Sequence, residues 1–200
     1  MLAGLSGYAG KILHVDLTRK EAVNKHLDVE VAKRFIGGRG LGAKILYDFM
    51  KPKTDPLGPE NILVFATGPL TGTTAPGSKM SVVAKSPLTG GYADSTIGGF
   101  LGAEIKFAGY DALVIHGKSQ KPTYILIEDD SVLFQDAVDL WGEGCFATET
   151  EIKEMLRDKK VRVASIGIAG ERLVKIACIT HEYGKQAGRC GLGAVMGSKN

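Results

Sequence analysis

Apolar and polar residues alternate along much of the chain in short runs that predict strands. Residues 11–17, KILHVDL, alternate as a half-buried strand does, and Thr18-Arg19-Lys20 predicts a hairpin turn into a second strand over 21–27. Residues 62–67, ILVFAT, are apolar throughout, which is typical of a strand buried on both faces. Further strands are predicted over 79–85, 111–117, 123–129, 132–136, 161–167 and 173–180.

Helices are predicted where capping residues precede apolar residues spaced three or four apart. Asp28 is placed to cap a helix that ends at Gly37, and a second helix runs from about Leu41 to Met50. A short helix is predicted near 98–107. Thr148-Glu149-Thr150-Glu151 has the form of a capping box, which predicts the start of an amphipathic helix at that point.

A weak internal repeat relates residues 61–110 to residues 161–200. Both segments run through an apolar strand, a Gly-x-x-Gly turn, a second strand, a polar loop and a glycine-rich stretch that enters a helix. Two such halves would present two similar glycine-rich loops. The repeat therefore predicts a domain that binds a pair of related chemical groups.

Glycine is the residue type that departs furthest from ordinary composition, with 27 in 200 residues against about 7% in typical proteins. The glycines cluster in 95–104, STIGGFLGAE, and 185–194, KQAGRCGLGA. Such loops let backbone N–H groups approach a phosphate, and Lys185 and Arg189 would add charged donors to the second loop. Glycines also permit close packing and left-handed turns, and the sequence leaves both interpretations open.

Charge and cysteine content exclude several other classes of protein. The 25 basic and 22 acidic residues are dispersed, so a nucleic-acid partner is not expected. No apolar run reaches the ~20 residues of a membrane span, and the N-terminus lacks a charged start before an apolar block, so we expect no membrane association and a cytoplasmic location. The three cysteines form no C-x-x-C pair, which indicates neither a disulfide framework nor a zinc site.

Two more specific interpretations rest on single motifs. Gly191-Leu192-Gly193 contains the start of a dinucleotide fingerprint, but a polar loop separates it from the preceding strand, where the fingerprint requires a strand to lead directly into it. The histidines are scattered, and His181, beside the second glycine loop, is the one placed near candidate chemistry. We identify no catalytic triad or carboxylate pair, and therefore no catalytic residue.

Longer strings of sequence resemble the N-terminal domain of the aldehyde:ferredoxin oxidoreductase family of tungsten enzymes. They extend over essentially all 200 residues and include GGRGLGAKILYD, PLGPEN, ENILVFATGPLTGTTAPGSKMSVVAKSPLTGGYADSTIGGFLGAEIKFAGYDALVIHGKS, VASIGIAGERLVKIACI and AGRCGLGAVMGSKN. The resemblance implies a single α+β domain over 1–200, with two β-sheets related by a pseudo-twofold axis and each half facing one pterin of a bis-molybdopterin cofactor that carries tungsten or molybdenum.

The resemblance also implies which residues contact that cofactor. Matched by position, they are Lys79, Thr96, Gly98, Gly99, Lys185, Gln186, Gly188 and Arg189. A magnesium ion that bridges the pterin phosphates would bind backbone carbonyls, with Thr96 and Gln186 as the candidates. Thr96 stands where the family pattern has asparagine, and Lys79 where it has arginine, so Lys79 keeps the charge but loses the planar fork.

The function implied is oxidation of aldehydes to carboxylic acids, with electrons passed through a 4Fe-4S cluster to ferredoxin. A cluster of this kind takes four thiolates, so three cysteines cannot ligate it, and we expect the ligands in later domains or a partner subunit. We also expect a homo-oligomer, and the 200 residues alone to be inactive. The alternatives are a non-catalytic cofactor-binding or assembly module and, less favoured, a Rossmann-type nucleotide-binding domain.

Overall fold

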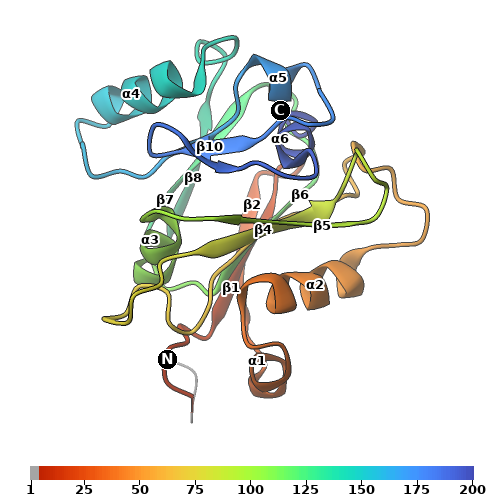
Figure 1. The fold of residues 1–200 in the computed structure, drawn as a ribbon. Coiled ribbons are helices and arrows are strands. Elements are labelled where there is room, and N and C mark those ends of the chain that lie inside the picture. The colour runs from red at the N-terminus through yellow and green to blue at the C-terminus, as the bar shows by residue number, and fades with distance from the viewer. Residues whose placement is uncertain (1–4) are drawn as a thin grey trace.

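The computed structural model describes residues 5–200 and places them in three β-sheets with short helices on either side (Figure 1). The strands are β1 (Lys11–Asp16), β2 (Glu21–His26), β3 (Leu63–Ala66), β4 (Met80–Lys85), β5 (Tyr92–Ile97), β6 (Ala112–His116), β7 (Thr123–Glu128), β8 (Ser131–Asp136), β9 (Ala164–Ser165), β10 (Ile179–His181) and β11 (Lys185–Ala187). The helices are α1 (Val29–Phe35), α2 (Gly38–Phe49), α3 (Leu101–Phe107), α4 (Cys145–Met155), α5 (Ile168–Glu171) and α6 (Leu192–Gly197). The predicted α+β class is confirmed.

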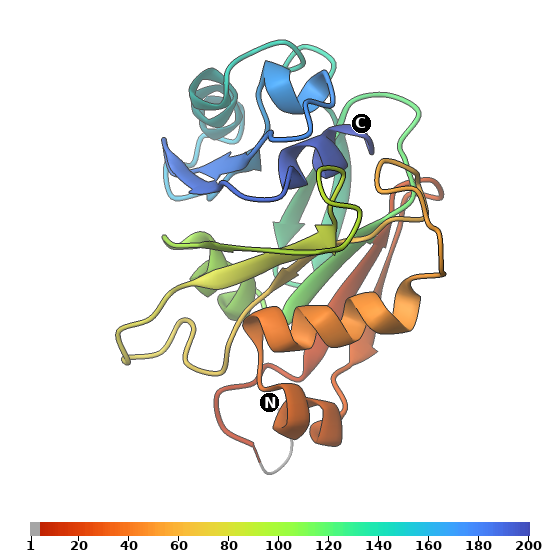
Figure 2. The same cartoon turned by 45° about the vertical axis from the view of Figure 1, so that its right-hand side comes forward.

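The largest sheet has six strands in the order β2-β1-β6-β3-β4-β5, with β1 and β6 parallel and the other neighbours antiparallel. Helices α1 and α2 lie on one side of it, while β10, α5 and α6 lie on the other (Figures 1 and 2). In β3, Leu63 and Phe65 belong to one apolar cluster, and Val64 and Ala66 to the other. The prediction that this strand is buried on both faces is therefore confirmed.

Of the two helices on the first face, α1 has the predicted cap. The Asp28 side chain accepts a hydrogen bond from the Val31 N–H at 2.9 Å, so α1 begins where the sequence places it. Helix α2 begins at Gly38, three residues before the predicted start. A β-carbon on Gly42 would lie 2.7 Å from Val83 Cγ2, so this glycine lets α2 approach β4 closely.

Several predicted boundaries were wrong. Helix α4 begins at Cys145 rather than after a capping box, because Thr148 and Glu149 are buried inside its first two turns. Strand β5 was missed, since the glycines around YADSTI mask the alternating burial of its residues. The apolar runs 161–167 and 173–180 contribute only short strands, because residues 161–163 and 166–167 are irregular and residues 173–176 lie in an exposed turn.

The two small sheets are formed by strands from the second half of the chain. Strands β7 and β8 form the predicted hairpin, and β9, β10 and β11 form a three-stranded antiparallel sheet that leads into α6. In the first half, β3, β4 and β5 likewise form consecutive antiparallel pairs before α3. This shared order supports the predicted repeat of 61–110 and 161–200, whose pseudo-twofold relation stays a prediction.

Candidate functional site

The two glycine-rich loops lie side by side, although 80 residues separate them in sequence. The first follows β5 and leads into α3, and the second includes β11 and leads into α6. His181 Nε2 lies 2.5 Å from the Gly98 carbonyl oxygen, and the Arg189 N–H donates to Ser95 Oγ at 3.3 Å. The fold therefore brings together the two loops that the sequence analysis singled out.

The residues predicted to contact a cofactor gather at this junction, most of them with exposed side chains. Met80 pairs with Ile97, which places Lys79 at the same end of the sheet as Gly98. The exposed members of the set are Lys79, Thr96, Lys185, Gln186, Gly188 and Arg189, while Gly98 and Gly99 are half-buried. The exposed polar surface there is one that an anionic molecule can reach.

The glycines of this junction differ in what surrounds them. A β-carbon on Gly98 would meet nothing within 4 Å, and one on Gly188 would meet only Gln186 Cβ at 4.0 Å. Gly99 has a φ of +97°, and a β-carbon there would lie 2.5 Å from His181 Cε1 and 2.7 Å from Glu182 Oε2. Gly98 and Gly188 thus leave space for a ligand, whereas the space at Gly99 is filled by the protein itself.

The glycines later in the second loop serve packing. β-carbons on Gly191, Gly193 and Gly197 would lie 2.0, 2.4 and 2.1 Å from the carbonyl oxygens of Lys175, Cys178 and Gly170 respectively. The six-stranded sheet has one parallel pair among its five strand pairs, whereas the dinucleotide fold needs a mostly parallel sheet. The glycines of this G-x-G motif therefore allow close packing against neighbouring backbone, and the motif is not a dinucleotide fingerprint.

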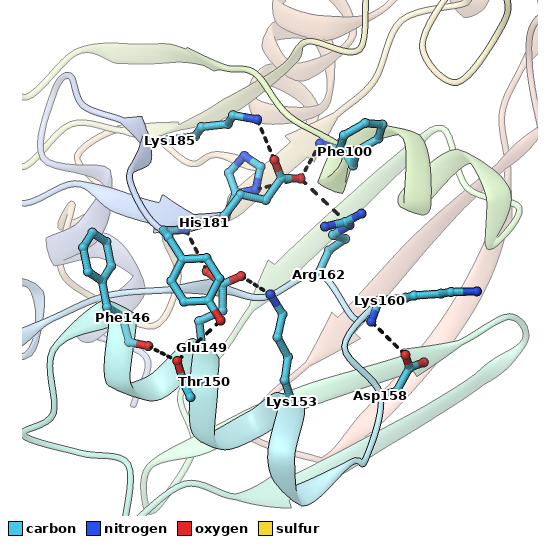
Figure 3. Close-up of polar contacts among 12 residues, drawn as sticks. Phe100, Phe146, Glu149, Thr150, Lys153, Asp158, Lys160, Arg162, His181 and Lys185 are labelled. Carbon is cyan, nitrogen blue, oxygen red and sulfur yellow. Dashed lines mark hydrogen bonds and ion pairs between the residues drawn. The ribbon is translucent and has the colours of Figure 1, made fainter.

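A group of charged side chains holds the two loops together (Figure 3). Glu182 accepts hydrogen bonds from the Phe100 N–H and from Lys185 Nζ, both at 2.6 Å. Arg162 Nε lies 3.9 Å from the same carboxylate, and its guanidinium stacks 5.0 Å from the Phe100 ring centroid. Burial alone would raise the pKa of Glu182, but the bonds from Lys185 and Phe100 outweigh it and lower the pKa below its usual 4.5.

His181 is buried between the loops, with 1% of its surface exposed. Burial lowers the pKa of this imidazole, and the bond to Gly98 and the nearby Glu182 offset only part of that effect. The neutral ring must donate from Nε2 to the Gly98 carbonyl, because a carbonyl oxygen only accepts. Within the described part of the chain, Nδ1 has no hydrogen-bond partner. Sequence analysis singled out His181 by its place, and the structure assigns it a linking role.

A second polar group supports the turn between β10 and β11 from α4. Glu149 is buried, pairs with Lys153 at 2.5 Å and accepts the Tyr183 N–H at 3.0 Å. Lys153 Nζ also lies 4.6 Å from the Tyr183 ring centroid, and Phe146 packs edge-on against that ring. Figure 3 shows these side chains rising from α4 toward the loop. Sequence analysis assigned Glu149 to a helix cap and did not identify Glu182 or Arg162.

An apolar cavity lies next to this group of side chains. Its volume is about 600 Å³, it lies between the six-stranded sheet, the β7–β8 hairpin and α4, and it is lined by Arg162 but by none of the residues predicted to contact the cofactor. Over residues 5–200 there is no group of three or more His, Cys, Asp or Glu side chains arranged to hold a metal ion. No helix in the same range is long and apolar enough to cross a bilayer.

The fold and the paired loops define the N-terminal domain of a family of oxidoreductases. Residues 12–200 match the family model described as aldehyde ferredoxin oxidoreductase, N-terminal domain, and the chain belongs to this family. It is 50% identical over 195 residues to the tungsten-containing aldehyde ferredoxin oxidoreductase of Pyrococcus abyssi, which covers 97% of this chain and 32% of that protein.

Two further relatives carry other activities in their names. An aliphatic sulfonate oxidoreductase, WOR-like subunit, of Pyrococcus furiosus is 43% identical over 208 residues, covering 96% of this chain and 33% of its own length. The solved active site complex BamBC of benzoyl coenzyme A reductase, in complex with 1,5-dienoyl-CoA, superposes with a TM-score of 0.94 at 40% identity, covering 97% of this chain and 30% of that one. The chain thus spans about a third of the length of the relatives it matches.

Proposed function

We propose that this chain carries the paired pterins of a tungsten or molybdenum cofactor and positions the metal for an oxidoreductase that converts aldehydes to carboxylic acids. The observation that carries the proposal is the junction of two glycine loops, where Gly98 and Gly188 leave open space beside Lys185 and Arg189. Backbone N–H groups and cations arranged in this way suit phosphate, and each pterin of such a cofactor carries a phosphate.

The donor set at the junction fits this cofactor. Thr96 and Gly98 would face the phosphate of one pterin, and Gln186, Gly188 and Arg189 that of the other, with Lys79 and Lys185 adding positive charge. Backbone carbonyls of Thr96 and Gln186 would hold the bridging magnesium ion. When bound, the cofactor supplies the two-electron chemistry, and the protein contributes binding and orientation.

The rest of the proposed enzyme lies outside these residues. Cys145, Cys178 and Cys190 are free thiols, and a 4Fe-4S cluster requires four thiolates. We therefore assign the cluster ligands, the substrate cavity and the contact with ferredoxin to further domains or a partner subunit. A cytoplasmic homo-oligomer is the assembly we propose.

The choice of aldehydes as substrates rests on the names of four relatives. Four tungsten-containing aldehyde ferredoxin oxidoreductases are 48–50% identical to this chain. The relatives named for sulfonate and glyceraldehyde-3-phosphate oxidation are 43% and 37% identical. Related N-terminal sequences thus occur in proteins named for different substrates. This supports a role of the domain in binding the cofactor rather than in selecting the substrate.

Metal and pterin analysis of the full-length protein from tungsten-replete cells tests the proposal. We expect about two pterins per metal atom and aldehyde-dependent reduction of ferredoxin. Protein that contains neither metal nor pterin would overturn the proposal. Protein that contains both but reduces no acceptor with any aldehyde would favour a non-catalytic cofactor-binding or assembly module.

A further inference from the structure

Glu182 joins the two loops through its side chain. It lies in the turn between β10 and β11, its side chain is 11% exposed, and it bonds to residues of both loops. The backbone around it is unusual, because Glu182 and Tyr183 both have positive φ values, +45° and +53°. Turns of this form favour Asn and Gly, so contacts of these side chains must offset the strain.

The contacts to the second loop fix the direction of Lys185. Glu182 Oε2 accepts from Lys185 Nζ at 2.6 Å, three residues along the same turn. The Tyr183 N–H of that turn is held in place by Glu149 Oε2 at 3.0 Å. A lysine on a free loop would sample many rotamers, whereas this one has a largely buried carboxylate as its partner.

The contacts to the first loop fix the start of α3. Glu182 Oε1 accepts from the Phe100 N–H at 2.6 Å, directly where the helix begins. A β-carbon on Gly99 would lie 2.7 Å from Glu182 Oε2 and 2.9 Å from Lys185 Cδ. Because Gly99 has no side chain, the Glu182 carboxylate can reach the start of α3. Any other residue at this position would displace the carboxylate.

We propose that Glu182 is a positioning residue that locks the two cofactor loops into one rigid unit. The proposal rests on the function proposed above. By occupying the Phe100 N–H, the carboxylate closes the start of α3 to a phosphate, which leaves Thr96 and Gly98 to face one phosphate and Gln186 and Arg189 to face the other. The negative charge of Glu182 also reduces the net positive charge that the neighbouring lysine and arginine side chains give the site.

Three variants of the full-length protein test this role. Glu182→Ala releases both loops, and we expect pterin retention after gel filtration to fall about tenfold, with amide exchange at Phe100 about tenfold faster. Glu182→Gln keeps one acceptor oxygen, enough for the Phe100 N–H but not for Lys185 as well, and should restore most of the protection at Phe100. Glu154→Gln, which changes an exposed carboxylate on α4, is the control and should match the wild type in both measurements.

The two readouts separate the failure of this proposal from failure of the proposed function. Wild-type protein without pterin would overturn the proposed function, while the exchange rates at Phe100 would still show whether Glu182 joins the loops. Pterin retention and exchange in Glu182→Ala equal to those of the wild type would overturn the positioning role. If Glu182→Ala does not fold, Glu182→Gln decides the matter, because it keeps an acceptor for the Phe100 N–H but loses the ion pair with Lys185, and it should lower pterin retention without faster exchange at Phe100. Wild-type pterin retention in Glu182→Gln would then overturn the positioning role.

Discussion

The two glycine loops look alike in sequence but are supported in different ways. The first extends from the six-stranded sheet, between the half-buried edge strand β5 and helix α3. The second extends from a three-stranded sheet whose strands have only two or three residues each. Because so short a sheet buries little apolar surface, side-chain contacts from α4 must supply part of the support for the second loop.

Each loop has a buried pair of a lysine and a carboxylate behind it. Lys106, in the last turn of α3, pairs with Asp111 at 2.5 Å, and Lys153 of α4 pairs with Glu149 at 2.5 Å. Asp111 also accepts the N–H groups of Ala9 and Gly10, so it ties the sheet to the N-terminal segment. The comparison indicates that the first pair stabilises the whole domain and the second stabilises mainly one loop.

The largest expected effect follows from breaking the first pair. Asp111→Ala leaves Lys106 charged and buried without its partner, and we expect the free energy of unfolding in urea to fall by about 4 kcal/mol. Glu149→Ala should cost about 2 kcal/mol, with faster amide exchange confined to the turn around Tyr183. Equal losses for the two variants would contradict the difference between the loops. Asp130→Ala, at an exposed pair with Lys11, is the control and should change little.

The second prediction separates packed from open glycines within one loop. In Gly197→Ala the new methyl group would lie 2.1 Å from the Gly170 carbonyl oxygen, and we expect a loss of about 3 kcal/mol in the free energy of unfolding. Gly188→Ala places its methyl group in open space and should change that free energy by less than about 0.5 kcal/mol. A large loss in Gly188→Ala would mean that this glycine serves the fold rather than a ligand.

The third prediction uses pH to probe the sheet that supports the first loop. Burial, followed by the nearby charges of Lys25 and His116, lowers the pKa of His14 to about 4, and its ring stacks on Phe49. The unfolded chain, with a histidine pKa near 6.5, therefore binds the proton first, so stability is lost as the pH falls. Between pH 7.5 and 5 the expected loss from His14 is about 2 kcal/mol.

Urea unfolding at a series of pH values measures this loss, and His14→Leu is the matched variant. In His14→Leu the decline between pH 7.5 and 5 should be shallower by about the same 2 kcal/mol. His181, whose pKa is also lowered, remains in the variant and accounts for part of the decline that is left. An unchanged decline in His14→Leu would show that the sheet does not hold this histidine in its neutral form.

Periodicity and capping predict the parts of the fold in which burial follows the chain locally. The hairpin at 11–26, the buried strand β3 and the Asp28 cap were predicted in this way. Strand β5 was missed because glycines flank it and because Ser95, a polar residue, becomes buried only through contacts with β4 and the second loop. Tertiary contacts of this kind leave no periodic signal in a single sequence.

The pair of loops in the candidate site could be predicted from the sequence. The role of each residue within the loops could not. Glycine content and a family resemblance placed both loops, yet Gly98 and Gly99 are neighbours with opposite surroundings. The carboxylate that distinguishes them, Glu182, is 83 residues from Gly99 in the sequence. Its role depends on a turn with two positive φ values, which the residues Glu-Tyr do not predict.

The smallest expected effect tests the free cation of the second loop. Arg189 is exposed, and no ion pair involves it in the part of the chain that the structure describes, whereas Lys185 is held by Glu182. Its backbone is nevertheless fixed, since the Arg189 N–H donates to Ser95 Oγ and the next carbonyl accepts from Ser86 Oγ. A charged side chain on a fixed backbone and without a protein partner is suited to a ligand phosphate.

Arg189→Ala should therefore weaken pterin retention by about tenfold, or ~1.4 kcal/mol, and leave the free energy of unfolding unchanged. Arg189→Lys should fall between the two, because the charge remains but the bidentate geometry is lost. Arg34→Ala, at an exposed arginine on α1, controls for the loss of one positive charge. Full metal and pterin content in Arg189→Ala would assign the phosphate contact to Lys185 instead, the cation that Glu182 holds in place.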